Sequence, residues 1–265
     1  MKRFFCCLMA AVLLLGTASC AMVAPAVPDV SPEIETTATE VPQSTQPDAS
    51  EVIVFNDTVL EGWVREALNK PTGDITAADA LNVTELDMQQ QGVDPDQPYI
   101  HNLDALKYFT NLTYLGLGFA VQNEQDPTAP IDISPLAGMT KLTSLQLGGL
   151  VIDDISVVAN MPDLESLTFF GGNKLVDISP LAGHAKLRAL TLRGNQITDI
   201  TPLKDLTQLV YLDLQDNQVT DVSVIAGLTN MNRLFLDGNP IEDYSVLTDV
   251  RSNLEEWDFH IPGQE

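Results

Sequence analysis

The chain has 265 residues, with 13 lysines and arginines against 37 aspartates and glutamates, and its formal net charge at pH 7 is −24. Phosphate backbones and anionic lipid surfaces repel so acidic a chain, which excludes nucleic acid as a partner. All three cysteines lie within the first twenty residues, so the remaining chain has no disulfide option and must be held by packing alone.

The N-terminal segment reads as an export signal. Residues 1–20 contain no acidic side chain, and Lys2 and Arg3 precede an apolar run that continues through Leu15. This is the pattern of a secretory signal peptide, and the run is too short for a membrane-spanning helix.

Residues 15–20 resemble a bacterial lipobox, in which small residues precede a cysteine. The resemblance implies that residues 1–20 are a lipoprotein signal peptide and that Cys20 becomes the lipidated first residue of the mature protein. Several acyl chains anchor a protein stably where one does not, so the protein would be held at the cell membrane, facing the extracellular side. Cleavage after Ala21 or Ala24, which would give a freely secreted protein, is the alternative.

Two segments separate this signal from the body of the chain. Residues 21–51 are rich in Pro, Thr, Ser, Ala and Glu and have no apolar period, which predicts a disordered tether. Residues 52–82 are predicted to form an N-terminal helical cap that covers the open apolar end of the domain. One helical stripe carries the apolar residues of the cap: Leu60, Trp63, Val64, Ala67 and Leu68.

The cap also carries start and stop signals for two helices. Thr58 and Glu61 are spaced as a capping box, and Pro71 ends the first helix. A second short helix is predicted to start at Thr76, with Asp79 three residues on.

Residues 83–252 are predicted to be a repeat array. Blocks of the form L-x-x-L-x-L open at intervals of 22 or 23 residues, at Leu142, Leu164, Leu187, Leu209, Met231 and Leu254. A fixed period in the twenties is typical of a solenoid, in which each unit buries its apolar face against its neighbours. Alternation within a block predicts a strand with its leucines inward, such as Leu187–Leu192. Residues 253–265, with Leu254, Trp257 and Phe259, are predicted to form a C-terminal cap strand and tail.

The first two units are irregular and carry extra residues around 94–98 and within 119–130. Insertions in solenoids form loops on one face, often the binding face. The alternative is variation in loop length without consequence for binding.

Three polar positions recur after most of the predicted strands, and each forms a column when the units are stacked. One is Asn, predicted to bond free backbone groups at a tight bend: Asn173, Asn195, Asn217 and Asn239, with Gln91, Ala120 and Leu150 in the same place earlier. The second is Ser or Thr, predicted to be the N-cap of a short convex helical turn: residues 134, 156, 179, 201, 223 and 245.

The third column is Asp, at residues 132, 154, 177, 199, 221 and 243. Six carboxylates in a row suggest a metal site. A single column, however, does not bring several oxygens together on one ion, as calcium requires. We therefore predict no metal and assign these residues to local backbone N–H groups at a bend.

Stretches such as LRALTLRGNQITDITPL, residues 187–203, resemble the short 22-residue leucine-rich repeats of bacterial surface proteins of the internalin type. The resemblance covers about residues 83–259. It implies an α/β repeat fold: a leucine-rich repeat solenoid with a parallel concave β-sheet, short 3-10 or helical convex turns and an N-terminal helical cap. It says little about the ligand, because one fold serves many partners.

The outward strand residues form four columns across the predicted concave face. Aromatic residues and arginine, the side chains typical of interface hot spots, gather there. The candidate ligand-binding residues are Tyr114, Phe170, Arg188, Arg193, Tyr211, Asp213, Arg233, Phe235 and Asp237. Scattered surface chemistry without a ligand is the alternative.

Searches for catalytic motifs find none. H-E-x-x-H, G-x-S-x-G and a P-loop are all missing from the sequence, as is a cysteine nucleophile in the body of the chain. His101, His184 and His260 are far apart; His184 is expected on a convex turn and His260 on the last concave strand. The chain is predicted to be non-enzymatic and to need no cofactor.

We therefore predict a cell-surface module that binds a protein, from a host or from the envelope, through its concave face; a glycan is the less favoured ligand. The membrane is contacted through the N-terminal lipid alone. A scaffold subunit of an envelope enzyme or transporter is the alternative function.

Overall fold

The computed structural model describes residues 48–88, 99–123, 125–126, 128–171 and 174–261, which belong to one compact unit, Gln46–Glu265. The predicted signal peptide, Cys20 and nearly all of the tether lie outside the described residues, as do the insertion at 94–98, Gln91 and Asn173. Within the described ranges, no helix has the length and apolar character needed to cross a membrane.

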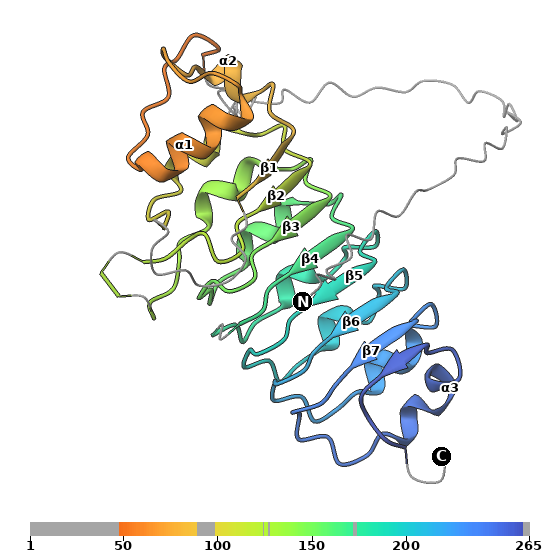
Figure 1. The fold of residues 1–265 in the computed structure, drawn as a ribbon. Helices are drawn as coiled ribbons and strands as arrows, with labels where there is room; N and C mark the ends of the chain where they lie inside the picture. Colours follow the sequence, from red (N-terminus) through yellow and green to blue (C-terminus); the bar gives the residue numbers. More distant parts are fainter. Residues whose placement is uncertain (1–47, 89–98, 124, 127, 172–173, 262–265) are drawn as a thin grey trace, which may run out of the picture. The chain divides into compact units, whose positions relative to one another are not determined.

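The body of the unit is one parallel sheet whose eight strands follow one another in chain order (Figure 1). The strands are β1 (Glu85–Asp87), β2 (Tyr114–Gly116), β3 (Ser144–Gln146), β4 (Ser166–Thr168), β5 (Ala189–Thr191), β6 (Tyr211–Asp213), β7 (Arg233–Phe235) and β8 (Glu256–Trp257). This confirms the predicted leucine-rich repeat solenoid.

The strands are shorter than the sequence pattern predicts. The pattern at Leu187–Leu192 predicts six residues, and β5 has three. Hydrogen bonds between neighbouring coils do continue past the strands, as from Leu117 N to Gln146 O at 2.9 Å. The chain bends at both strand ends, however, so the regular ladder covers only the centre of each predicted strand.

A column of leucines forms the spine of the core. The register pairs the central residue of each strand from β2 to β7 with that of the next, and these residues are fully buried: Leu115, Leu145, Leu167, Leu190, Leu212 and Leu234. Each leucine therefore packs mainly against the neighbouring coil, which is the reason for the period in the sequence.

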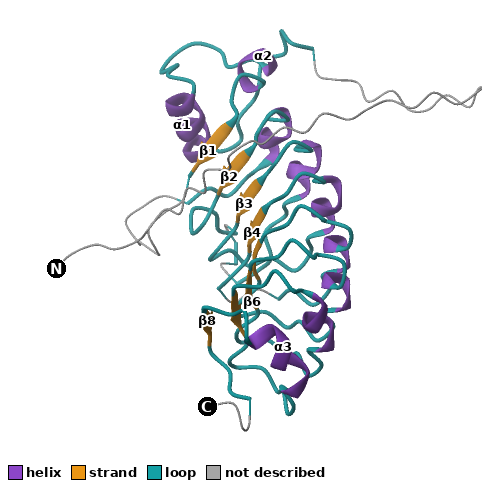
Figure 2. Cartoon of the chain, turned by 90° about the vertical axis from the view of Figure 1, so that its right-hand side faces the viewer, coloured by secondary structure: helices purple, strands orange, loops and turns teal. Residues whose placement is uncertain are grey.

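Short 3-10 helices form a row on the side away from the sheet (Figure 2). They are η1 (Asp104–Tyr108), η2 (Ser134–Gly138), η3 (Ser156–Asn160), η4 (Ser179–Leu181), η5 (Thr201–Leu203), η6 (Ser223–Gly227) and η7 (Ser245–Leu247), followed by the α-helix α3 (Thr248–Arg251). Each places an aliphatic side chain in the core, such as Leu136, Leu203 and Ile225. We call the opposite, outward side of the sheet the concave face.

The Ser and Thr residues are not the N-caps of these turns, contrary to the prediction. A buried aliphatic residue such as Ile133 or Ile178 holds the N-cap position, and its side chain makes no cap bond. The cap role falls to the preceding Asp, the nearest outward side chain. Asp132 Oδ1, for example, accepts the Ser134 N–H at 2.8 Å. The Asp column does support local backbone N–H groups, as predicted.

Two helices form the N-terminal cap: α1 (Thr58–Ala67) and α2 (Ala77–Ala80). The short helix predicted to start at Thr76 is confirmed as α2, with Thr76 as its N-cap and Asp79 completing a capping box. The one predicted at Thr58 and Glu61 is wrong, because Asp57 is the N-cap of α1.

Asp57 also joins the cap to the repeats. One of its carboxylate oxygens accepts the N–H groups of Val59 and Leu60, both at 2.9 Å. The other accepts those of His101 at 2.7 Å and Asn102 at 3.3 Å. The sequence pattern missed this residue because two of its partners lie more than forty residues away.

The C-terminal cap closes the other end with aromatic residues. Tyr244 and Phe259 stack with centroids 5.3 Å apart, and the Arg251 guanidinium lies 3.3 Å from the Trp257 ring centroid. β8 stops at Trp257, shorter than the predicted strand, because the Asp258 carboxylate takes over the pairing. It accepts the N–H groups of Leu236 at 2.7 Å and Asp237 at 3.0 Å.

Candidate binding face

Strand register places the outward residues in straight columns, as predicted. One column runs Tyr114, Ser144, Ser166, Ala189, Tyr211, Arg233, Glu256. The next runs Gly116, Gln146, Thr168, Thr191, Asp213, Phe235. In these columns the residues on β2 to β4 are uncharged, whereas those from β6 to β8 are aromatic or charged.

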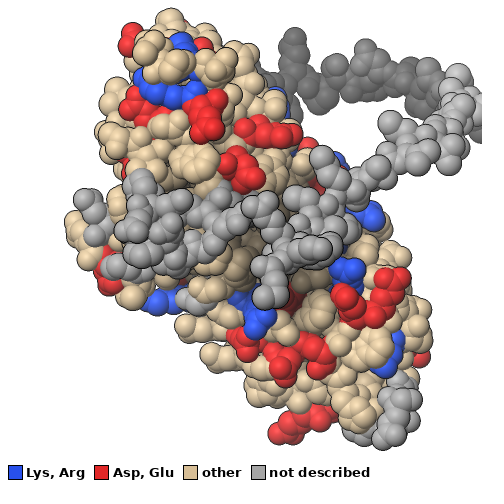
Figure 3. Space-filling view, viewed as in Figure 1, with Lys and Arg blue, Asp and Glu red and all other residues tan. Residues whose placement is uncertain are grey.

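The charged side chains at the C-terminal end have both signs. Acidic and basic groups lie next to one another over the part of the molecule where β5 to β8 run (Figure 3). We define the C-terminal patch as Arg188, Arg193, Tyr211, Asp213, Arg233, Phe235 and Asp237, the seven candidate residues that fall on or beside these strands.

An aromatic pair lies at the centre of the C-terminal patch. The rings of Tyr211 and Phe235 are 5.7 Å apart and tilted by 50°. Both side chains are partly buried. Burial raises the pKa of the Tyr211 hydroxyl, and the nearby Asp213 carboxylate raises it further. The hydroxyl therefore stays protonated at neutral pH.

Two arginines of the patch are held by ion pairs. Arg193 Nε lies 3.1 Å from Asp216 Oδ2, and Arg233 Nε lies 3.1 Å from Glu256 Oε2. All four side chains are about half exposed, so these pairs stabilise the fold little. Their effect is to orient the guanidinium groups. Arg188 is exposed and has no acidic partner among the residues that the structure describes.

Asp213 lies beneath the exposed surface of the C-terminal patch. Its side chain is nearly buried, and that burial raises the pKa of its carboxyl group, while a hydrogen bond from Gln215 N at 3.0 Å and the charge of Arg193 act in the opposite direction. Gln215 Nε2 in turn donates to Asp258 at 2.8 Å. A residue that is only 7% exposed offers little surface to a ligand.

The two remaining candidates lie on earlier coils, with Phe170 aligned beside Arg193 of the patch. Tyr114 is on β2, and its neighbours in the column are Glu85 and Ser144. Phe170 packs against Phe119, with ring centroids 5.9 Å apart. Phe119 lies in the second insertion, and the sequence pattern did not single it out. The sequence does carry a signal for Phe119, because most of the later units have glycine at the aligned position.

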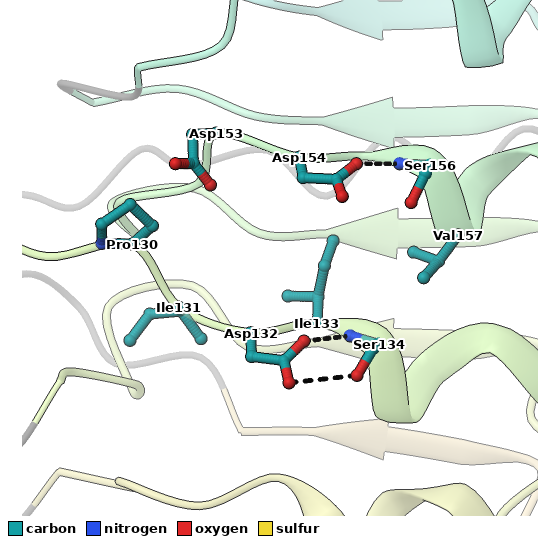
Figure 4. Close-up of a pocket in the computed structure, with 9 residues that line it drawn as sticks. All are labelled: Pro130, Ile131, Asp132, Ile133, Ser134, Asp153, Asp154, Ser156 and Val157. Carbon is teal, nitrogen blue, oxygen red and sulfur yellow. Dashed lines mark hydrogen bonds between the residues drawn. The ribbon is translucent and has the colours of Figure 1, made fainter.

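The Asp column does not converge. Around the hollow drawn in Figure 4, Asp132 and Asp154 each turn toward their own serine, at 2.8 and 2.7 Å from its backbone N. Within the described ranges, no three His, Cys, Asp or Glu side chains are grouped so that they could hold a metal ion.

The histidines are likewise separate. His184 follows η4 on the convex side, as expected, and its buried ring lies between the carbonyl oxygens of Leu181 and Val158 at 3.1 and 3.0 Å. His260 is exposed and lies beyond the end of β8, not on that strand as predicted. Neither arrangement provides a nucleophile or a base beside a substrate cavity.

Comparison with known proteins agrees with this geometry. Residues 185–227 and 207–249 match the family model described as leucine-rich repeats in two copies. An internalin (inlF) from Listeria monocytogenes is similar, with 31% identity and a TM-score of 0.67 over 78% of this chain and 58% of that one. Internalin C2 (inlC2) from the same organism has 26% identity and a TM-score of 0.56, over 78% of this chain and 95% of that one.

The chain therefore contains leucine-rich repeats and folds as a solenoid similar to those of the internalins. It spans 58% of the length of the first internalin, so that protein's full activity does not transfer to it. No curated protein matches the chain.

Proposed function

We propose that this protein is a non-enzymatic, exported binding module that holds a protein ligand on the C-terminal patch of its concave face. The observation that carries the proposal is the pairing of Tyr211 with Phe235 beside the oriented Arg233, with a second oriented arginine, Arg193, on the preceding coil. Aromatic residues and arginine dominate the energetics of protein interfaces. Charges of both signs favour a protein over a neutral glycan, because a glycan offers no charged group to complement them.

The mechanism is preorganisation. The patch residues lie on or beside strands whose leucines are fully buried, so little ordering entropy is lost when a ligand binds. The guanidinium groups of Arg193 and Arg233 are already oriented by acidic neighbours. A ligand that carries carboxylates could displace Asp216 or Glu256 and form charge-assisted hydrogen bonds in their place.

Affinity capture with the full chain tests this proposal. Extracellular and envelope fractions are passed over immobilised protein, and the retained protein is identified. Replacing Tyr211 and Phe235 together with alanine is expected to weaken its binding by about 30-fold or more, the usual effect of removing a hot spot. Ser144→Ala, on the uncharged part of the same face, is the matched control. Equal loss in both variants, or in neither, would contradict the proposal.

The identity of the captured partner distinguishes the two functions. An external protein supports the recognition role, whereas a stable envelope complex retained through the same residues supports the scaffold alternative.

The membrane anchor is a separate part of the proposal. It is supported by the lipobox-like residues 15–20 alone. Mass spectrometry of detergent-extracted protein is expected to show an acylated N-terminal Cys20, and Cys20→Ser should release the protein into the medium. An unmodified N-terminus downstream of Cys20 would rule out the anchor.

A further inference from the structure

Phe119 holds a backbone conformation that other units reserve for glycine or aspartate. The hydrogen bonds between coils align Phe119 with Gly149, Gly171, Gly194, Asp216 and Gly238. All these residues have positive φ, and that of Phe119 is +58°. This left-handed conformation is unfavourable for a bulky side chain. Strain of this kind persists where the surroundings enforce it, and it marks candidate functional sites.

Phe119 and Phe170 form an aromatic pair that packs against Gly148 and Gly149. The rings meet edge to face, with an interplanar angle of 63°. A methyl group added to Gly148 would collide with the Phe170 ring, and one added to Gly149 would collide with Phe119. Both rings are nevertheless partly exposed. The backbone therefore accommodates two large apolar side chains that remain within reach of a ligand.

A hollow opens beside Phe119. Its lining includes the apolar residues Val121, Ile131 and Val151 beside the polar Gln122 and Asn123, and its volume is about 70 Å³. We call it the rim pocket. Among the described residues that line it, none is charged, although the chain as a whole carries −24. This volume is well below the usual range for a small-ligand site, so the hollow suits a single side chain.

Hydrogen bonds between coils hold the pocket walls. Ile100 N donates to Ala120 O at 2.8 Å, and Gln122 N donates to Ile100 O at 3.0 Å. Ile131 N donates to Val151 O at 2.8 Å. These bonds tie the second insertion, which supplies Val121 and Gln122 to the pocket wall, to the neighbouring coils.

Carboxylates lie immediately beyond Ile131. This residue also borders two neighbouring hollows. One is lined by Asp132, Asp153 and Asp154 (Figure 4). The other is lined by Asp104 and Asp132. The nearby cation Lys174 is engaged with the Thr128 carbonyl oxygen at 3.0 Å. The rim pocket is thus a hollow whose described lining is uncharged and mixes polar with apolar groups, and it is bordered by an acidic surface.

We propose that the rim pocket is a second binding site, separate from the C-terminal patch, for a basic polypeptide segment. An aromatic or branched aliphatic side chain of that segment enters the pocket beside Phe119, and flanking lysine or arginine residues face Asp132 and Asp153. Charge complementarity identifies this partner. A neutral sugar would leave the acidic border unused, and an acidic peptide would be repelled.

Methyl NMR of the full chain tests the proposal directly. The first probe is a short blocked peptide with one phenylalanine between pairs of lysines. A second peptide has serine in place of the phenylalanine, and a third has glutamates in place of the lysines. The first peptide alone is expected to shift the methyl signals of Val121, Ile131 and Val151, and added salt should weaken its binding.

The variant Phe119→Gly should lower affinity for the first peptide at least tenfold. Because glycine suits a positive φ, the thermal midpoint should not fall. If this variant fails to fold, Phe119→Asn serves instead, since asparagine also tolerates this conformation. Asp153→Asn should weaken binding and reduce its salt dependence. Val246→Ser, at an exposed valine on η7, is the control and should bind normally.

Several results would overturn the site. They are equal binding of the serine peptide, unchanged affinity in Phe119→Gly, and no shift at millimolar peptide. Shifts confined to residues around Tyr211 would also overturn the rim pocket while leaving the C-terminal patch in place. If a neutral oligosaccharide such as maltohexaose shifts the same methyl signals and the peptides do not, the polypeptide partner is wrong.

Discussion

At the residue scale, single polar side chains hold neighbouring coils together. Asn217 is the clearest case. Its Nδ2 donates to the carbonyl oxygens of Leu192 and Leu214, both at 2.9 Å, and its Oδ1 accepts the Ile197 N–H at 3.1 Å. Asn239 makes the corresponding bonds one coil later. The Asn ladder predicted from the repeat is therefore confirmed for these residues.

Replacing Asn217 with alanine should destabilise the protein by about 2–4 kcal/mol, because several buried backbone groups lose their partner together. Urea unfolding followed by circular dichroism measures the change. Gln218→Ala, at the exposed neighbouring residue, should cost far less. A loss of stability no larger than that of the control would show that the ladder is not needed.

Asp213 gives a prediction about pH. Its folded-state pKa is raised above the unfolded value, chiefly by burial, so the ionised carboxylate opposes folding at neutral pH. Asp213→Asn keeps an acceptor for Gln215 N, and it should raise the thermal midpoint at pH 7. The advantage should vanish below about pH 4, where the carboxyl group is protonated in both states. A midpoint difference that does not change with pH would contradict this explanation.

The pKa shift of the aspartates in the bend column has the opposite direction. Hydrogen bonds from Thr201 lower the pKa of Asp199, and bonds from Ser223 and Ser245 do the same for Asp221 and Asp243. Each stabilises the fold above about pH 4 and loses that effect as the pH falls through its folded-state pKa. Asp199→Asn should therefore lower the midpoint at pH 7, and the difference should shrink in acid.

At the element scale, the N-terminal cap depends on Asp57. The first helix was predictable from its apolar stripe, but its N-cap was not, because a capping box at Thr58 matched the same local spacing. What distinguishes Asp57 is the second pair of N–H groups it accepts, from His101 and Asn102. That contact joins α1 to the first repeat and appears only once the chain has folded.

Asp57→Ala should destabilise the protein by about 2–4 kcal/mol, which combines a lost N-cap with one buried and three partly buried N–H groups left unpaired. The amide exchange of His101 and Asn102 should accelerate as well, as hydrogen exchange with NMR detection would show. Thr58→Ala, at the residue first predicted to be the cap, should have little effect. A larger loss of stability in Thr58→Ala than in Asp57→Ala would instead support Thr58 as the N-cap.

At the scale of the whole molecule, each coil contacts chiefly its neighbours. The sheet pairs strands only in chain order, and the leucine spine is the same from β2 to β7. The ends of the stack differ from its middle, because the C-terminal end is closed by Trp257, Phe259 and the Asp258 carboxylate.

Deleting residues 187–208, one full period, should leave a folded protein with one coil fewer and lower stability, because each coil's contacts are nearly interchangeable. Deleting residues 248–265 should instead expose the apolar end and promote aggregation. Circular dichroism and light scattering of the two variants make the comparison. Aggregation of the internal deletion alone would contradict the interchangeability of coils.

The sequence by itself determined the repeat, its period, the inward leucines and the columns of the concave face, because these follow from spacing along the chain. Only the tertiary structure decided which side chains of neighbouring coils pair with one another. It paired Phe170 with Phe119, which the sequence pattern had not singled out, and it oriented Arg193 and Arg233 with carboxylates from neighbouring coils. The physical reason is that side-chain pairing across coils depends on register and loop path, which a repeat pattern does not specify.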